Sequence, residues 1–178
     1  MYQILKQIIK TGIKTEAPPQ ADEAMRLKTQ HLQQRILDVF GGALAIRHVD
    51  AGSCNGCELE IHAVNNAYYN IEGLGIKFVA SPRHADMLLV TGPVSRHMVT
   101  ALKRTFDATP EPKLVVAIGD CACDGGIFCP QGADGAGESY ASCGKVANVI
   151  PVDVAVSGCP PTPTAILQGI LTAISAKK

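Results

Sequence analysis

The chain has 178 residues, of which 47% are hydrophobic and 18% are charged. This composition is typical of a globular protein with a core of its own, and it excludes a wholly disordered chain. Lysine plus arginine and aspartate plus glutamate number 16 each, so no overall positive field favours nucleic acid, and we expect no nucleic-acid partner.

Residues 1–14 predict an amphipathic helix with three lysines and no acidic residue. Its apolar stripe consists of Ile4, Leu5, Ile8, Ile9 and Ile13. Such a helix can lie on a membrane surface, dock on a partner protein or cover its own domain. The lysines also interrupt every candidate signal-peptide run. No apolar run in the sequence approaches the roughly 18 residues of a membrane span.

A proline-containing break follows at residues 16–22, and residues 22–40 have a second helical pattern. Polar residues dominate this second pattern until its last few positions, so it offers little apolar surface to a core. We therefore predict two parts. An N-terminal extension with an amphipathic helix covers residues 1–40, and a compact domain covers residues 41–178.

From residue 41 onward, short apolar runs alternate with helical patterns. The predicted strands are 43–49, 75–80, 86–91, 113–118 and 149–156, and the predicted helices are 57–70, 94–106 and 163–176. Buried strands that alternate with helices are typical of a parallel sheet covered on both faces. The predicted fold class is therefore α/β, flavodoxin-like, with a mainly parallel sheet. A glycine-rich stretch at 120–147 has no helical period and predicts a long loop.

Cysteine positions follow the predicted strands. Cys54 and Cys57 come after the first strand, Cys121 after the fourth and Cys159 after the fifth. In a parallel sheet these turns all lie at the carboxyl edge, where open α/β sheets bind ligands. With no export signal, seven cysteines are also better suited to metal or redox chemistry than to a disulfide framework. The sequence therefore predicts a four-thiolate site.

Four thiolates suit a 4Fe–4S cluster and also a structural zinc ion. One close pair plus two single cysteines, on glycine-bearing turns with room for a bulky group, favour the cluster. A redox dithiol would leave Cys121 and Cys159 without a role. The three further cysteines, Cys123, Cys129 and Cys143, are interpreted as spare thiols beside the site. Cys123 is the main rival of Cys121 as a ligand.

Four motifs in order make the chain recognisable, namely "AGSCNGCELEI", "SPRHADMLLVTGPVS", "GDCACDGGIF" and "VDVAVSGCPPTPTAIL". Over residues 43–175 the sequence resembles the small subunit of energy-converting, membrane-bound nickel–iron hydrogenases of the formate hydrogenlyase and CO-linked type. It is also similar to the homologous terminal-cluster subunit of respiratory complex I. This resemblance implies one 4Fe–4S cluster held by Cys54, Cys57, Cys121 and Cys159. Cys121 is preferred to Cys123 because the family pattern Cys-Ala-x-x-Gly-Gly begins there.

The resemblance also implies partners and a location. They are a hydrogenase large subunit, which alone would hold the nickel–iron centre, and other iron–sulfur and membrane subunits, on the cytoplasmic side of the cell membrane. This chain would relay electrons, without a complete active site of its own. Two residues separate Cys54 from Cys57, whereas the complex I subunit has adjacent cysteines, and this spacing favours hydrogenase. The alternatives are a complex I-like module whose cluster reduces quinone, and a zinc-bound scaffold without redox activity.

Polar residues near the motifs have open roles. Glu58 and Glu60 fit a helix start, where carboxylates favour the helix dipole, or a proton path or a subunit contact. Arg83 is interpreted either as an ion-pair or helix-end residue or as a subunit contact. Asp120 and Asp124 flank Cys121, where they either add negative charge beside a cluster or serve as ordinary turn residues.

Overall fold

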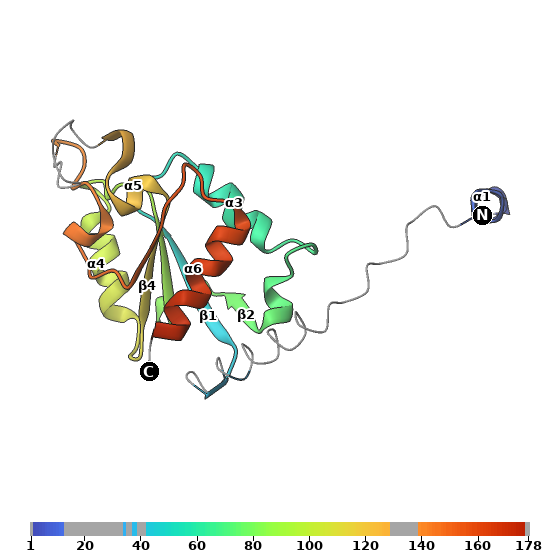
Figure 1. The fold of residues 1–178 in the computed structure, drawn as a ribbon, viewed down its shortest axis with the longest axis horizontal. Helices are drawn as coiled ribbons and strands as arrows, with labels where there is room; N and C mark the ends of the chain where they lie inside the picture. Colours follow the sequence, from blue (N-terminus) through green and yellow to red (C-terminus); the bar gives the residue numbers. More distant parts are fainter. Residues whose placement is uncertain (1, 13–33, 35–36, 39–41, 129–138, 177–178) are drawn as a thin grey trace.

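The computed structural model describes residues 2–12, 34, 37–38, 42–128 and 139–176. Near the N-terminus, helix α1 covers Tyr2–Thr11, as the sequence predicts (Figure 1). The predicted helix over 22–40 lies for the most part outside the described residues, as do the predicted domain boundary at 40/41 and Cys129.

A single five-stranded sheet forms the centre of the domain. Its strands are β1 (Leu44–Asp50), β2 (Ile76–Phe78), β3 (Met87–Thr91), β4 (Leu114–Ile118) and β5 (Val154–Val156). They pair in the order β2-β1-β3-β4-β5, and every pairing is parallel. This is the flavodoxin-like strand order. The α/β prediction is therefore confirmed, and the sheet is wholly parallel.

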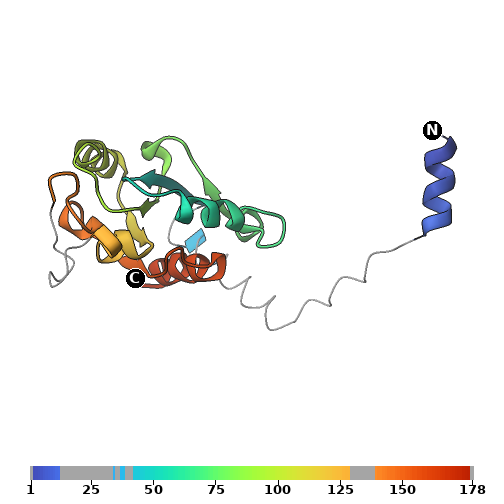
Figure 2. The same cartoon turned by 90° about the horizontal axis from the view of Figure 1, so that it is seen from above.

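Helices cover both faces of this sheet (Figures 1 and 2). On one face, α3 (Gly56–Val64) and α6 (Pro163–Ala176) bury their apolar sides against the strands. On the other face, α4 (Val99–Ala108) and α5 (Asp120–Cys123) enclose a second core. All five residues of β3 and of β4 are buried, because successive strand residues point to opposite faces and both faces are covered.

Three element boundaries differ from the predictions by five or more residues. Helix α3 ends at Val64 because the Asn66 carboxamide oxygen accepts the backbone N–H groups of Tyr68 and Tyr69 and turns the chain. Helix α4 begins only at Val99, after a segment that pairs with residues 141–144. Strand β5 begins only at Val154.

The start of β5 has a local cause. The Asp153 carboxylate, in place of a backbone carbonyl, accepts the N–H of Val115 at 2.7 Å. The residues before it do not continue the ladder, and Ile150 is buried in the second core. The eight-residue apolar run in the sequence therefore contains a turn and a core anchor as well as a strand.

The predicted long loop over 120–147 is wrong for its beginning and its end. Helix α5 starts directly after β4, and short 3-10 turns occupy Gly126–Phe128 and Val146–Asn148. None of these segments is longer than four residues, so none is long enough to produce a helical period in the sequence. Helix α5 is important because it carries Cys121.

Strand order reverses between β1 and β3, because the chain leaves β1 for β2 at one edge and then returns to β3 on the other side of β1. Doubly wound sheets bind their ligands at the carboxyl edge beside such a switch point. The turns after β1, β3, β4 and β5 all end at this edge of the sheet.

Candidate metal centre

A cavity of about 120 Å³ lies at the carboxyl edge of the sheet. The four cysteines of the sequence prediction, Cys54, Cys57, Cys121 and Cys159, all line it. Five of the remaining lining residues come from the same turns and one, Gly92, from the turn after β3; they are Ser53, Gly56, Gly92, Asp120, Gly158 and Pro160. The structure therefore brings together three thiol-bearing segments that are up to 105 residues apart in the sequence (159 minus 54).

The first cysteine turn is fixed by short-range hydrogen bonds. The Asp50 carboxylate, at the end of β1, accepts the N–H groups of Gly52 at 2.8 Å and Ser53 at 2.7 Å. Asn55 then takes a left-handed conformation, with φ of 73°, and α3 begins directly after it. This geometry places Cys54 on the turn and Cys57 in the first turn of the helix.

The second and third cysteine turns are tied to each other by Asp120. Its carboxylate accepts the Gly158 N–H at 2.7 Å, and its own N–H donates to the Gly158 carbonyl at 3.0 Å. This reciprocal pair joins the residue before Cys121 to the residue before Cys159. The sequence did not predict this role, because the two partners are 38 residues apart and an aspartate before a cysteine does not indicate a distant partner.

Glu58 is the centre of a buried polar network. Its carboxylate accepts hydrogen bonds from the Ser53 hydroxyl at 2.5 Å and from the Thr91 hydroxyl. His48 Nε2 lies 3.0 Å from the Thr91 hydroxyl oxygen and 3.6 Å from the Glu58 carboxylate. Only 8% of Glu58 is exposed. Its hydrogen bonds join the first cysteine turn to the end of β3, so its role is larger than an interaction with the helix dipole.

The four thiols influence one another electrostatically. Burial, followed by the neighbouring Glu58 carboxylate and then the other three thiols, raises the pKa of Cys57 to about 12. Burial, followed by Cys159 and Cys54, raises the pKa of Cys121. Ionised together, these sulfurs would repel one another, so a group that binds all four as thiolates has to supply positive charge.

Cys123, the rival of Cys121, belongs to a different environment. Its thiol faces the Ala117 carbonyl oxygen at 3.7 Å, and it packs with Cys143 against the core cluster on the other sheet face. Burial raises the pKa of Cys123 to about 11. Since Cys121 lines the cavity and Cys123 does not, the structure separates two cysteines that only one residue divides in the sequence.

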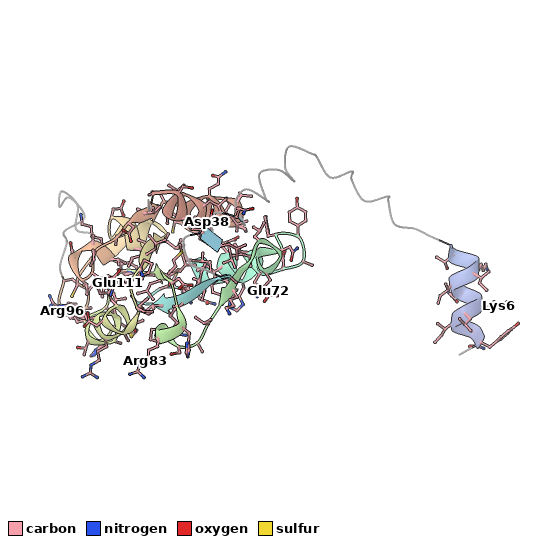
Figure 3. The ribbon with its side chains drawn as sticks, turned by 90° about the horizontal axis from the view of Figure 1, so that it is seen from below. Lys6, Asp38, Glu72, Arg83, Arg96 and Glu111 are labelled. Carbon is pink, nitrogen blue, oxygen red and sulfur yellow. The ribbon has the colours of Figure 1, made fainter. Side chains whose placement is uncertain are left out.

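Arg83 is exposed and points away from the domain (Figure 3).

Two glycines allow the backbone to lie close to the first cysteine segment. A Cβ atom at Gly119, where φ is +90°, would lie 2.6 Å from Cys57 Sγ. A Cβ atom at Gly92, where φ is +75°, would lie 2.5 Å from the Ser53 backbone nitrogen. Four thiols, a cavity between them and side-chain-free backbone at its wall fit a 4Fe–4S cluster, whose usual ligands are four cysteines.

The described ranges contain no group of three or more His, Cys, Asp or Glu side chains that could hold one metal ion. They also contain no helix long and apolar enough to cross a membrane.

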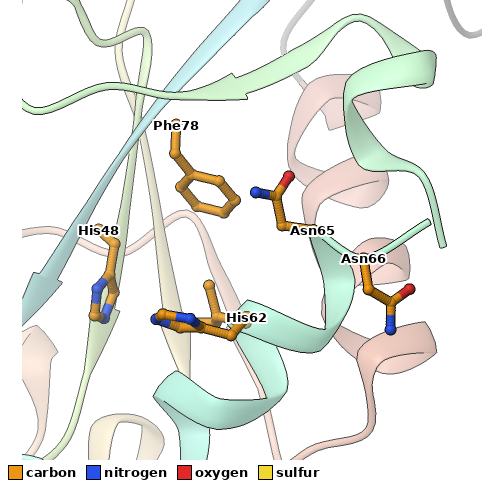
Figure 4. Close-up of a pocket in the computed structure, with 6 residues that line it drawn as sticks. His48, His62, Asn65, Asn66 and Phe78 are labelled. Carbon is orange, nitrogen blue, oxygen red and sulfur yellow. The ribbon is translucent and has the colours of Figure 1, made fainter. Parts of the chain in front are cut away.

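A larger cavity, of about 500 Å³, lies along α3. His48 from β1 and His62 from α3 point into it, and the Phe78 ring from β2 lies over it (Figure 4). Ile61, Asn65 and Asn66 complete its lining. Because His48 also contacts Thr91 and Glu58, the polar network runs from this cavity to Ser53 at the cysteine cavity.

Comparison with known proteins gives consistent relatives. The family described as "NADH ubiquinone oxidoreductase, 20 Kd subunit" matches residues 54–173. The "Probable membrane-bound hydrogenase subunit mbhJ" of Pyrococcus furiosus is 43% identical over 148 residues, which cover 82% of this chain and 84% of that protein. "Formate hydrogenlyase subunit 7" of Escherichia coli is 43% identical over 129 residues, which cover 72% of this chain and 48% of that longer protein.

A solved structure has the same fold. A chain of the archaeal membrane-bound sulfane sulfur reductase, described as a respiratory membrane complex, superposes with a TM-score of 0.63 and 28% sequence identity. The superposition covers 85% of this chain and 78% of that chain.

Proposed function

Because the chain belongs to the family of the 20 Kd subunit of NADH ubiquinone oxidoreductase, we propose that it is an electron-transfer subunit that carries one 4Fe–4S cluster. Cys54, Cys57, Cys121 and Cys159 would hold that cluster in the 120 Å³ cavity. When bound, the cluster would accept and donate single electrons. The observation that carries this proposal is the meeting of four thiols from three separate turns around one cavity.

The surrounding chain supports such a site by keeping its ligands fixed. Asp120 holds the second and third turns together, and Glu58 holds the first turn against β3. Metal and redox sites need ligand positions held within roughly 0.5 Å, and packed, hydrogen-bonded supports of this kind provide that precision. Asp120, Gly158 and Glu58 thus belong to the proposed site, although they would not be ligands of the cluster.

For the partner we propose a hydrogenase large subunit that holds a nickel–iron centre, in a complex at the cytoplasmic side of the cell membrane. Exposed apolar residues support a protein contact near the cysteines, because large exposed apolar side chains mark interaction sites. Leu59 on α3 is 63% exposed, and Ile127 and Phe128 after α5 are 87% and 51% exposed. The two-residue spacing of Cys54 and Cys57, and the relatives named as hydrogenase and formate hydrogenlyase subunits, favour hydrogen chemistry in that partner.

A second candidate function is electron delivery to quinone, as in complex I. The family description and the 500 Å³ cavity favour it, because that cavity combines an aromatic ring with the polar groups of His48 and His62. Ligand pockets for planar organic molecules have this mixture of apolar walls and a few polar groups. Helix α3 lines this cavity and also carries Cys57, so both functions would use the same cluster.

The cluster itself is tested by anaerobic purification of the complex and metal analysis. We expect about four irons and matching acid-labile sulfide per chain, and an electron paramagnetic resonance signal on reduction. Serine at position 54, 57, 121 or 159 should lower the iron content and alter that signal. Cys123→Ser and Cys143→Ser are matched controls and should leave both unchanged. One zinc and no iron per chain would instead establish the scaffold alternative.

The two redox functions differ in the large subunit. Purification through a tag on this chain should bring down a large subunit with two C-x-x-C pairs, nickel, and hydrogen-dependent reduction of a viologen dye. A large subunit without those pairs, in a complex that reduces quinone and contains no nickel, would overturn the hydrogenase assignment and select the quinone function.

A further inference from the structure

Helix α1 presents an apolar face that no described residue covers. None of the residues from Tyr2 to Thr11 is buried. The large apolar side chains keep most of their surface in solvent: Tyr2 78%, Ile4 65%, Leu5 54%, Ile8 60% and Ile9 82%. A contiguous exposed face of isoleucine and leucine is a site of association with another apolar surface.

The distribution of charge on α1 restricts what that surface can be. With 3.6 residues per turn, Ile4, Leu5, Ile8 and Ile9 occupy one half of the helix circumference. Lys6 and Lys10, one turn apart, lie on the polar half (Figure 3 labels Lys6). Residues 1–14 contain no aspartate or glutamate. The helix therefore combines a wide apolar face with purely positive charge, which is the pattern of helices that lie in a lipid interface.

The length of α1 also indicates that it needs a covering surface. It has 10 residues, and isolated helices shorter than about 12–15 residues are marginal in water. Isoleucine and threonine are, in addition, weaker helix formers than leucine or alanine. An apolar surface that takes up the isoleucine face would therefore stabilise the helix as it binds.

We propose that α1 binds flat to the anionic lipid surface of the membrane, with its isoleucine face at the acyl boundary and Lys6 and Lys10 at the lipid phosphates. Lysine stems can lie along apolar surface while their ammonium groups reach the headgroups. This contact deepens the proposed peripheral location of the subunit, on which it depends, and it does not depend on the cysteine site. It would hold the subunit against the membrane in addition to its contacts with other subunits.

The test uses the full chain and vesicles of two compositions, phosphatidylcholine alone and phosphatidylcholine mixed with phosphatidylglycerol. Wild type should sediment with the mixed vesicles and much less with the neutral ones, and high salt should release it. The double variant Lys6→Gln/Lys10→Gln should bind the mixed vesicles roughly 25-fold more weakly, at about fivefold for each lysine. Ile8→Asp should abolish binding to both.

A matched control removes the same charge from the domain. Lys103 and Arg104 are exposed on α4, and Lys103→Gln/Arg104→Gln should bind the mixed vesicles as wild type does. Equal binding to neutral vesicles, or lysine variants that bind as wild type does, would overturn the proposal. Iron content of the same preparations separates this result from failure of the cluster assignment.

Photo-crosslinking in the assembled complex distinguishes lipid from protein as the surface that covers α1. A photo-crosslinking residue in place of Ile8, activated in native membranes, should form lipid adducts. Adducts with protein alone would mean that a partner subunit covers the α1 face, and the lipid proposal would be wrong.

Discussion

Replacing Gly119 by alanine should prevent metal binding in the cysteine cavity while leaving the domain folded. The new Cβ atom would lie 2.6 Å from Cys57 Sγ, whereas non-bonded heavy atoms prefer separations of about 3.5–4.0 Å. The sulfur would therefore have to move by about 1 Å, which exceeds the roughly 0.5 Å tolerance of a metal or redox site. Cys57 can rotate to relieve the contact, but its sulfur then leaves its present position beside the other thiols.

Gly75→Ala is the control for alanine at a positive φ without a steric contact. Gly75 has φ of +80°, close to the +90° of Gly119, but a Cβ atom there would meet nothing within 4 Å. Alanine at Gly75, where ψ is 26°, takes a left-handed helical conformation at a cost of about 1–2 kcal/mol. In a chain of this length that cost corresponds to a fall in Tm of about 2–8 °C. At Gly119, ψ is 155°, and this backbone region is essentially restricted to glycine, so we expect a larger loss of stability there. Iron content, rather than Tm, therefore reports the contact with the thiol.

The assay is iron per chain and the electron paramagnetic resonance signal of the reduced protein, together with Tm of the metal-free chain. For the metal-free chains we expect a cooperative unfolding transition in both variants, with the lower Tm in Gly119→Ala. We expect wild-type iron in Gly75→Ala and little iron in Gly119→Ala. If Gly119→Ala retained the iron content and signal of wild type, the steric reasoning and the cavity geometry behind it would be refuted.

Two further predictions concern polar residues near the cavity. Asp120→Ala removes the acceptor of the Gly158 N–H, so it should lower the free energy of unfolding by about 1.5–3 kcal/mol and also lower the iron content. Asp120→Asn keeps an acceptor oxygen and should restore most of the stability and most of the iron. Equal losses in the two variants would contradict the role given to Asp120. Burial lowers the pKa of His48 below its ordinary 6.5, so the unfolded chain takes up a proton there that the folded chain does not, and the metal-free protein should lose stability as the pH falls through 6.5. His48→Gln should flatten this part of the pH profile, measured by urea unfolding at pH 7.5 and 5.5, and an unchanged profile would mean that other groups cause it.

The fold class and the region of the site follow from local patterns in the sequence. Short apolar runs followed by Gly92, Gly119 and Gly158 indicate buried strands that end at turns. Because parallel strands end at a common edge, cysteines after the first, fourth and fifth strands had to be near one another. The start of α6 also follows a local pattern, because threonine before proline is typical of a helix N-terminus. In the structure Thr162 accepts the Ala165 N–H at 3.3 Å, and Pro163 is the first helical residue.

Precise placement was beyond such reasoning. The spacing of residues left Cys121 and Cys123 as rivals, because a turn can present either one, and the preference for Cys121 came from the family pattern. In the structure, helix α5 places Cys121 at the cavity and Cys123 against the opposite core. The predicted start of β5 and the predicted end of α3 were also wrong, because the side chains of Asp153 and Asn66 replace backbone hydrogen-bond partners there.

What the sequence determined by itself is therefore the alternation of elements and the positions of four thiols at strand ends, because both depend on periods and spacings along the chain. What only the tertiary structure decided is how those thiols are held. Glu58 reaches Thr91 across 33 residues, and Asp120 reaches Gly158 across 38. Such contacts depend on the packing of distant segments, and side-chain identity along the chain does not encode which distant group will lie within hydrogen-bonding distance.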